Sequence, residues 1–200
     1  MRTQRDVYAH LNNGVMHLAN QGVTVNEIHR VYDVPPALQR SWAARSYHGS
    51  VEHNARAVIN RYLGYWDGNP ATLIPLAPRE SAPLFVEMMG GADAVMMRAR
   101  ELINAGDYLL AVEILNKLVY AEPENPEGRQ LLADAFEQVG YQQESPSVRN
   151  SFLAAALELR SGIPTGVPPT STGPDFVRAL STLQFLDYLG IQLDSSKVGD

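Results

Sequence analysis

The chain has 200 residues, of which 45% are hydrophobic and 19% charged, values that are ordinary for a folded domain and exclude global disorder. It contains no Cys, which excludes disulfide bonds, Cys-based zinc sites and thiol catalysis. The net charge is −6, so we expect no nucleic-acid partner. The polar N-terminus lacks the apolar core of a signal peptide, and no stretch predicts a membrane span.

The N-terminal stretch predicts one long amphipathic helix followed by two short ones. Four apolar residues recur with the period of a single helical face: Val7, Leu11, Val15 and Leu18. The capping-box sequence at residues 24–27 predicts a second helix that continues to about Asp33. Pro36 then opens a third helix, whose predicted buried face carries Leu38 and Trp42.

Two more helices are predicted before residue 92. Ser50 is the expected N-cap of a helix that ends near Gly64. Its predicted buried stripe consists of Val51, Ala55, Val58 and Tyr62. A loop rich in Gly and Pro over residues 65–79 separates it from a helix over residues 80–89, which Gly90-Gly91 stops.

Residues 92–160 contain an internal repeat. Three pairs of similar residues lie 34 positions apart: Ala99 and Ala133, Leu102 and Phe136, Gly106 and Gly140. This is the tetratricopeptide period, and it predicts two helix hairpins with helices near 92–105, 107–121, 126–139 and 145–160. Since such a hairpin cannot bury its apolar face alone, residues 1–90 are expected to pack against the pair.

The C-terminal part predicts a change of organisation. Residues 161–174 are rich in Pro, Gly and Thr and are expected to be a linker, whereas residues 175–189 predict one amphipathic helix. Ile191 to Leu193 predicts the start of a strand. The predicted fold is therefore all-α: a helical array over residues 1–160 with two tetratricopeptide-like hairpins at about 92–160, a linker, and a truncated start of a second domain over residues 175–200.

The strongest candidate for chemistry is the segment of residues 45–54. It places a guanidinium, a phenol, two imidazoles, a hydroxyl and an amide around a predicted helix N-terminus. The free N–H groups of such a terminus suit an oxyanion, an Arg fork suits sulfate or phosphate, and an imidazole is able to donate a proton to a leaving oxygen. The alternative interpretation is structural: Ser50 only caps the helix, and His53 and Asn54 form a pair on its surface.

Several segments together resemble the dimerisation region of the zinc-dependent alkyl sulfatases, the linear primary alkylsulfatases of the metallo-β-lactamase superfamily. The segments are Ala19-Asn20-Gln21-Gly22, residues 45–54, Tyr62-Leu63-Gly64-Tyr65-Trp66-Asp67-Gly68-Asn69-Pro70, Met89-Gly90-Gly91-Ala92-Asp93, Ala111-x-x-x-Leu115-Asn116-x-Leu118-Val119 and Leu131-Leu132-Ala133-Asp134-Ala135-x-Glu137-x-x-Gly140-Tyr141. The resemblance covers roughly residues 4–160, and residues 161–190 resemble the lead-in to that family's C-terminal sterol-carrier-like domain.

The resemblance implies an enzyme of three parts, of which this chain is expected to be the middle. Two zinc ions are expected in a metallo-β-lactamase-like catalytic domain, whose His-x-His-x-Asp-His motif does not occur in this sequence. We therefore expect the chain to bind no metal or other cofactor and to be inactive alone. The family hydrolyses long-chain alkyl sulfates, such as dodecyl sulfate, to alcohol and sulfate. The expected partners are a second copy of the chain in a homodimer, the catalytic domain, and the alkyl sulfate substrate.

The resemblance also assigns roles within residues 45–54. The family pattern, an Arg, then aromatic-aromatic-Gly-Thr, then Ser-His-Asn, is kept at Arg45, Tyr47, Gly49, His53 and Asn54. Ser50 replaces the Thr and retains its hydroxyl, whereas His48 replaces an aromatic residue and Glu52 replaces the Ser, which brings a negative charge beside the expected sulfate pocket. The resemblance thus implies that His53 is the proton donor and that four residues bind sulfate: Arg45, Tyr47, Ser50 and Asn54.

Two further functions compete with that of an alkyl sulfatase section. The main alternative is a stand-alone helical-repeat module for protein interaction, without catalysis. The other is a helical protein that binds lipids or surfactants. Self-association is expected in any case, because many large apolar residues lie outside the repeats, including Trp42, Tyr62, Tyr65 and Trp66.

Overall fold

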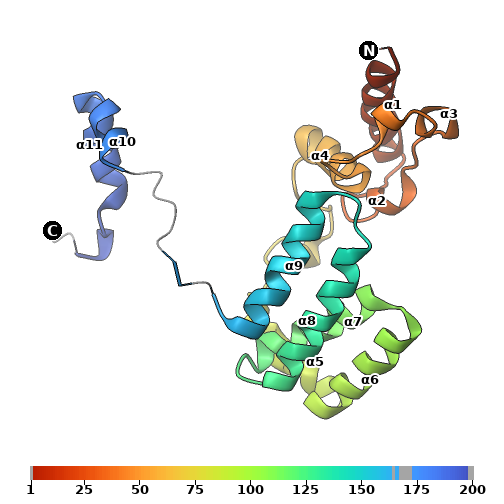
Figure 1. Cartoon of the computed structure of the whole chain (residues 1–200), viewed down its shortest axis with the longest axis vertical. Coiled ribbons are helices and arrows are strands. Elements are labelled where there is room, and N and C mark those ends of the chain that lie inside the picture. Colours follow the sequence, from red (N-terminus) through yellow and green to blue (C-terminus); the bar gives the residue numbers. More distant parts are fainter. Residues whose placement is uncertain (1, 164, 167–172, 198–200) are drawn as a thin grey trace. The chain divides into compact units, whose positions relative to one another are not determined.

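The computed structural model describes residues 2–163, 165–166 and 173–197. Over these residues the chain forms eleven α-helices and no strand, which confirms the all-α prediction (Figure 1). The chain divides into two compact units, Met1–Gly162 and Ile163–Asp200. The first unit contains α1 to α9 and the second contains α10 and α11.

The N-terminal helices of the first unit surround a small core of their own. Helix α1 (Arg2–Asn20) packs against α4 (Val51–Leu63), and the short α2 (Ile28–Val31), α3 (Pro36–Gln39) and 3-10 helix η1 (Trp42–Ala44) lie beside them. The fully or nearly buried residues of this core are Val15, Val25, Ile28, Tyr32, Ala55 and Ile59. Gly14 is explained by this packing, because the ring of Tyr32 lies 3.1 Å from the position that a Cβ at Gly14 would take.

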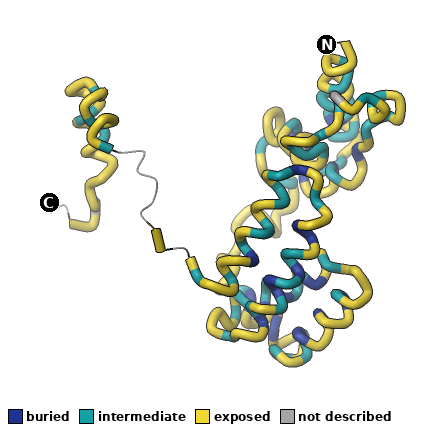
Figure 2. Tube along the Cα trace, in the orientation of Figure 1, coloured by how far each residue is buried: buried dark blue, intermediate teal, exposed yellow. Residues whose placement is uncertain are grey.

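Five longer helices form the larger core of the first unit. Their bounds are α5 (Pro78–Met88), α6 (Ala92–Ala105), α7 (Tyr108–Ala121), α8 (Pro126–Tyr141) and α9 (Pro146–Ser161). The last four match the predicted helices of residues 92–160 closely and pack as two hairpins, α6 on α7 and α8 on α9 (Figure 1). Leu115, Leu118 and Leu132 are at most 2% exposed, and Figure 2 shows buried positions along the inner sides of these helices.

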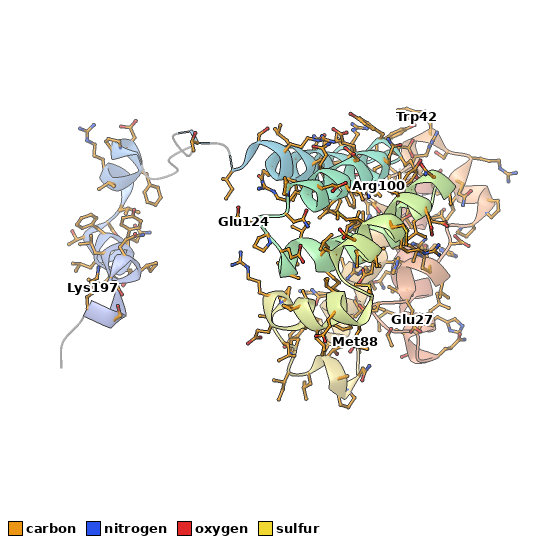
Figure 3. The ribbon with its side chains drawn as sticks, turned by 90° about the horizontal axis from the view of Figure 1, so that it is seen from below. Glu27, Trp42, Met88, Arg100, Glu124 and Lys197 are labelled. Atoms are coloured by element: carbon orange, nitrogen blue, oxygen red, sulfur yellow. The ribbon has the colours of Figure 1, made fainter. Side chains whose placement is uncertain are left out.

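The structure corrects three expectations in the N-terminal part. Trp42 lies in η1 and is 75% exposed, not on a buried face of α3 (Figure 3). Tyr62 is 56% exposed, so the buried stripe of α4 is shorter than predicted. Helix α2 begins only at Ile28. The carboxylate of Glu27 accepts the hydrogen bond from the Thr24 N–H that a capping box predicts, but the Thr24 hydroxyl donates to the same carboxylate, and residues 25–27 form a turn before the helix.

The second unit also differs from the prediction. Instead of one helix it has α10 (Pro174–Ala179) and α11 (Thr182–Gln192), and the break falls where Ser181 and Gln184 form a capping box that starts α11. Ile191 continues α11, so the expected strand is wrong. No described residue of this unit is buried. Half of the expected linker, at residues 164 and 167–172, lies outside the described residues.

Candidate functional site

The loop between η1 and α4 is held in place by the turn between α8 and α9. The hydroxyl of Ser145, a residue only 4% exposed, donates a hydrogen bond of 2.9 Å to the backbone carbonyl of His48. Beside it, Nη2 of Arg45 lies 2.7 Å from Oε1 of Glu144. Both members of this ion pair are about half exposed, so it adds little stability and acts mainly to orient the Arg45 side chain.

Arg45 also lies over an aromatic ring of the same loop. Its guanidinium carbon is 5.4 Å from the ring centroid of Tyr47, within cation–π range. Glu144 engages Nη2, and the remaining guanidinium N–H groups donate to no described protein group. Arg45 is therefore fixed on two sides and still offers donors to an anion.

Ser50 occupies the N-cap position of α4, as predicted, but its side chain does not cap the helix. Its backbone is extended, with φ −136 and ψ 139, and its hydroxyl donates to the carboxylate of Glu52 instead of accepting from a helix N–H. This hydrogen bond is the main reason that the pKa of Glu52 is lowered, and Glu52 is therefore ionised at neutral pH. Nδ1 of His53 lies 3.2 Å from the same Ser50 hydroxyl, which links the three side chains.

Two cavities of about 600 Å³ each meet at this loop. The first lies between α1, α4 and the loop, and Arg45, Tyr47 and Asn54 line it. The second lies between the loop and the α8–α9 turn, and Arg45, Ser50 and Glu52 line it. His53 is exposed and lines neither cavity. The structure thus brings three of the five candidate residues to one cavity and places Ser50 and His53 outside it.

His29 is a residue of the second cavity that the sequence did not single out. Its Nδ1 is buried and has no hydrogen-bond partner among the described residues. Burial is the main reason that the pKa of His29 is lowered. The positive charges of Arg30, Arg56 and His53 lower this pKa further, whereas the negative charge of Glu52 raises it. No motif or period marks His29, because its burial results from the packing of distant segments.

The lowered pKa of His29 predicts a loss of stability in mild acid. Below its ordinary pKa of 6.5, the unfolded chain binds a proton at His29 more readily than the folded chain, so the free energy of unfolding falls as the pH drops through that value. The carboxyl groups of Glu27, Glu52 and Glu137 also have lowered pKa values, but they change the free energy of unfolding in a separate window, below about pH 4.5. We expect urea denaturation to show lower stability at pH 5.5 than at pH 7.5, and His29→Gln to flatten this difference. The exposed His17→Gln is the control; an equal flattening in both variants would contradict the prediction.

The described residues do not form a metal centre. No group of three or more His, Asp or Glu side chains is placed to hold a metal ion in the part of the chain that the structure describes. A hydrolytic zinc site requires several converging ligands, and the residues here do not fit one. Among the described helices, none is long and apolar enough to cross a membrane.

The fold defines an all-helical domain in which the α8–α9 turn holds the loop between η1 and α4. The family of alkyl sulfatase dimerisation domains matches residues 24–162. An (R)-specific secondary-alkylsulfatase of a Pseudomonas species is 48% identical over 97% of this chain and 29% of its own length. A linear primary-alkylsulfatase of a Pseudomonas species is 42% identical over 98% of this chain and 29% of its length.

A solved structure agrees with these sequence matches. The stereoselective inverting sec-alkylsulfatase of a Pseudomonas species superposes with a TM-score of 0.91 and 47% identity, over 98% of this chain and 31% of that one. The chain belongs to the alkyl sulfatase dimerisation family, as the sequence resemblance predicted. It spans about 30–40% of the length of the curated relatives it matches.

Proposed function

We propose that this chain is the dimerisation and active-site-walling section of an alkyl sulfatase that hydrolyses long-chain alkyl sulfates, such as dodecyl sulfate, to alcohol and sulfate. The observation that carries the proposal is the match of alkylsulfatases over 97–98% of this chain. Relatives named for primary and for secondary alkyl sulfates match almost equally well, so the proposal covers both kinds of substrate. Residues 1–160 form the dimerisation-type domain with tetratricopeptide-like hairpins, residues 161–174 the linker, and residues 175–200 the lead-in to a sterol-carrier-like domain.

Within this proposal, residues 45–54 face the sulfate group of the substrate. Arg45, Tyr47 and Asn54 bind the sulfate oxygens, which is supported by their common cavity and by the unengaged N–H groups of Arg45. Ser50, whose hydroxyl donates to Glu52 in the adjoining cavity, is a secondary contact of the sulfate, and His53 donates a proton to the leaving oxygen of the ester. In the whole enzyme, two zinc ions belong to the catalytic domain, which lies outside this chain.

A homodimer is the assembly we propose. Large apolar side chains remain exposed in and before α5: Trp42 75%, Tyr65 87%, Ile74 88%, Leu84 60% and Met88 75%. Figure 3 labels Trp42 and Met88 among them. Exposed large apolar side chains in this number support an interface with a partner, and two-fold dimers are the commonest assembly. The family to which the chain belongs is named for dimerisation, which supports this assembly.

A chimeric enzyme tests the proposal directly. The matching third of the 48% identical secondary-alkylsulfatase is replaced by this chain, and both turnover of secondary alkyl sulfates and molecular mass in solution are measured. We expect a dimer that retains turnover within about tenfold of the relative. The control is the relative with the same third deleted, which is expected to be inactive. A folded, zinc-loaded chimera that is monomeric or inactive would contradict the proposal and favour the stand-alone interaction module.

A further inference from the structure

Three side chains at the start of α4 are connected by two hydrogen bonds. The hydroxyl of Ser50 donates to Oε2 of Glu52, and the oxygen of the same hydroxyl lies 3.2 Å from Nδ1 of His53. Nε2 of His53 has no hydrogen-bond partner among the described residues. We call Glu52, Ser50 and His53 together the α4 network.

The direction of both hydrogen bonds follows from the number of protons in the α4 network. The Ser50 hydroxyl has one proton, and an ionised carboxylate has none to donate. Because the pKa of Glu52 is lowered, chiefly by its hydrogen bond with Ser50, its carboxylate is ionised at neutral pH. The Ser50 proton is therefore given to Glu52, and only His53 is left to supply the proton of the second hydrogen bond. It follows that Nδ1 of His53 carries a hydrogen and donates to Ser50.

We propose that Glu52 and Ser50 are positioning residues, which hold the His53 imidazole with a hydrogen on Nδ1 and leave Nε2 free to exchange a proton with a bound molecule. The hydrogen bond of one ring nitrogen determines which nitrogen carries the proton in the neutral ring. An exposed imidazole in water ordinarily prefers the hydrogen on Nε2. The α4 network thus favours the opposite tautomer at His53.

The inference deepens the proposed function, on which the role of His53 as a proton donor rests. A protonated His53 keeps its Nδ1 hydrogen on Ser50 while the N–H bond at Nε2 breaks and an O–H bond to the leaving oxygen of the ester forms. The donation leaves neutral His53 with its hydrogen on Nδ1, which is the tautomer that the α4 network stabilises. Water then returns a proton to Nε2 before the next turnover.

Two further observations support this role of the α4 network. The Ser50 hydroxyl is available because it does not cap α4, although a Ser at this position ordinarily accepts a hydrogen bond from a helix N–H. The Glu52 carboxylate also attracts a protonated His53, and this attraction is one of the smaller causes of the lowered pKa of Glu52. Since the family pattern has a Ser in place of Glu52, the carboxylate of the network is a departure of this chain from that pattern.

Long-range proton–nitrogen NMR correlations on the 200-residue chain measure the tautomer of each histidine ring. The spectra are recorded at about pH 8.5, where an ordinary histidine is neutral. The ratio of Nδ1–H to Nε2–H should be about two- to tenfold higher at His53 than at His48, the factor that one net hydrogen bond supplies. His48 is the internal reference, because it is exposed and its ring has no hydrogen bond with a described residue. His53→Gln and His48→Gln assign the two signals.

Variants of the α4 network test the role of each member. Ser50→Ala should return the ratio at His53 to that at His48, whereas Ser50→Thr keeps a hydroxyl and should retain the wild-type ratio. Glu52→Ala releases the Ser50 proton, which Nδ1 of His53 then accepts, so the ratio should turn towards Nε2–H. Glu113→Ala removes an exposed carboxylate from α7 and should leave the ratio unchanged. Circular dichroism verifies that each variant is folded.

Activity in the chimeric enzyme gives the second measurement. Glu52→Ala should lower kcat roughly tenfold with little change in KM, because His53 then presents the wrong nitrogen to the ester. Glu113→Ala should leave both constants unchanged. A merely structural effect of Glu52 would change the melting temperature without changing the tautomer of His53.

Two results would overturn the inference: a tautomer ratio at His53 equal to that at His48, or a ratio that stays the same in folded Ser50→Ala. Neither depends on turnover, so they differ from a failure of the proposed function. A chimera without turnover contradicts the function, and the tautomer in the isolated chain still decides the inference. The expected tautomer together with full turnover of Glu52→Ala would contradict the role of His53 as proton donor.

Discussion

Replacement of His53 by alanine in the chimeric enzyme is expected to lower turnover by about 10²–10⁴-fold, the range for loss of a general acid or an oxyanion donor. The melting temperature should change little, because the His53 side chain is exposed and its only hydrogen bond among the described residues is the one with Ser50. Turnover and melting temperature are measured on the same purified variant. The structure makes this a clean experiment, since a catalytic loss cannot be explained by lost packing.

A matched histidine provides the control for His53. His17 is also exposed and on a helix, with one side-chain hydrogen bond to Gln21, and His17→Ala should leave turnover unchanged. If His53→Ala also keeps full turnover, His53 is only a surface residue of α4, and the proposed roles of Arg45, Tyr47 and Asn54 then lose their catalytic partner. The alternative structural interpretation of residues 45–54 would then hold.

Replacement of Leu115 by alanine is expected to lower the free energy of unfolding by about 2–5 kcal/mol. Leu115 is fully buried in α7, in the core shared by α5 to α8, and truncation leaves a cavity that close-packed neighbours fill only in part. This is a large share of the 5–15 kcal/mol that stabilises a typical domain. Urea denaturation of the isolated chain, followed by circular dichroism, measures the change.

Leu110, on the same helix, is the matched control for Leu115. It is 58% exposed, so Leu110→Ala should change the free energy of unfolding by less than about 0.5 kcal/mol. If the two variants are equally stable, α7 is not at the centre of the core as the structure places it. A large loss for Leu110 alone would instead indicate that its face of α7 is covered in a dimer.

Glu52 shows how a departure from the family pattern alters the site. The resemblance places a Ser at this position, and the carboxylate here binds the hydroxyl of Ser50, which the same resemblance assigns to sulfate. Since the pKa of Glu52 is lowered, the carboxylate remains charged while it holds Ser50. In the proposed site this negative charge disfavours sulfate next to Ser50 and leaves Arg45, Tyr47 and Asn54 as the principal ligands.

The helices were predictable because their signals are local. The 34-residue repeat, Pro126 and Pro146 in the first helical turns, and the left-handed Gly106 after α6 each act within a few residues of the helix ends that they mark. The prediction failed where two local signals compete. Ser181 and Gln184 start a new helix inside an apolar pattern that is continuous in sequence.

The sequence by itself determined the all-helical fold, the positions of α6 to α9 and the segment in which to look for an anion site. Only the tertiary structure decided the surroundings of that segment. Ser145 holds His48 from 97 positions further along the chain, and Glu144 holds Arg45 from 99 positions further along. No period or motif connects residues so far apart. The same holds for the burial of the Nδ1 atom of His29. Burial and hydrogen-bond partners depend on which surfaces meet when the helices pack, and that information is distributed over the whole chain.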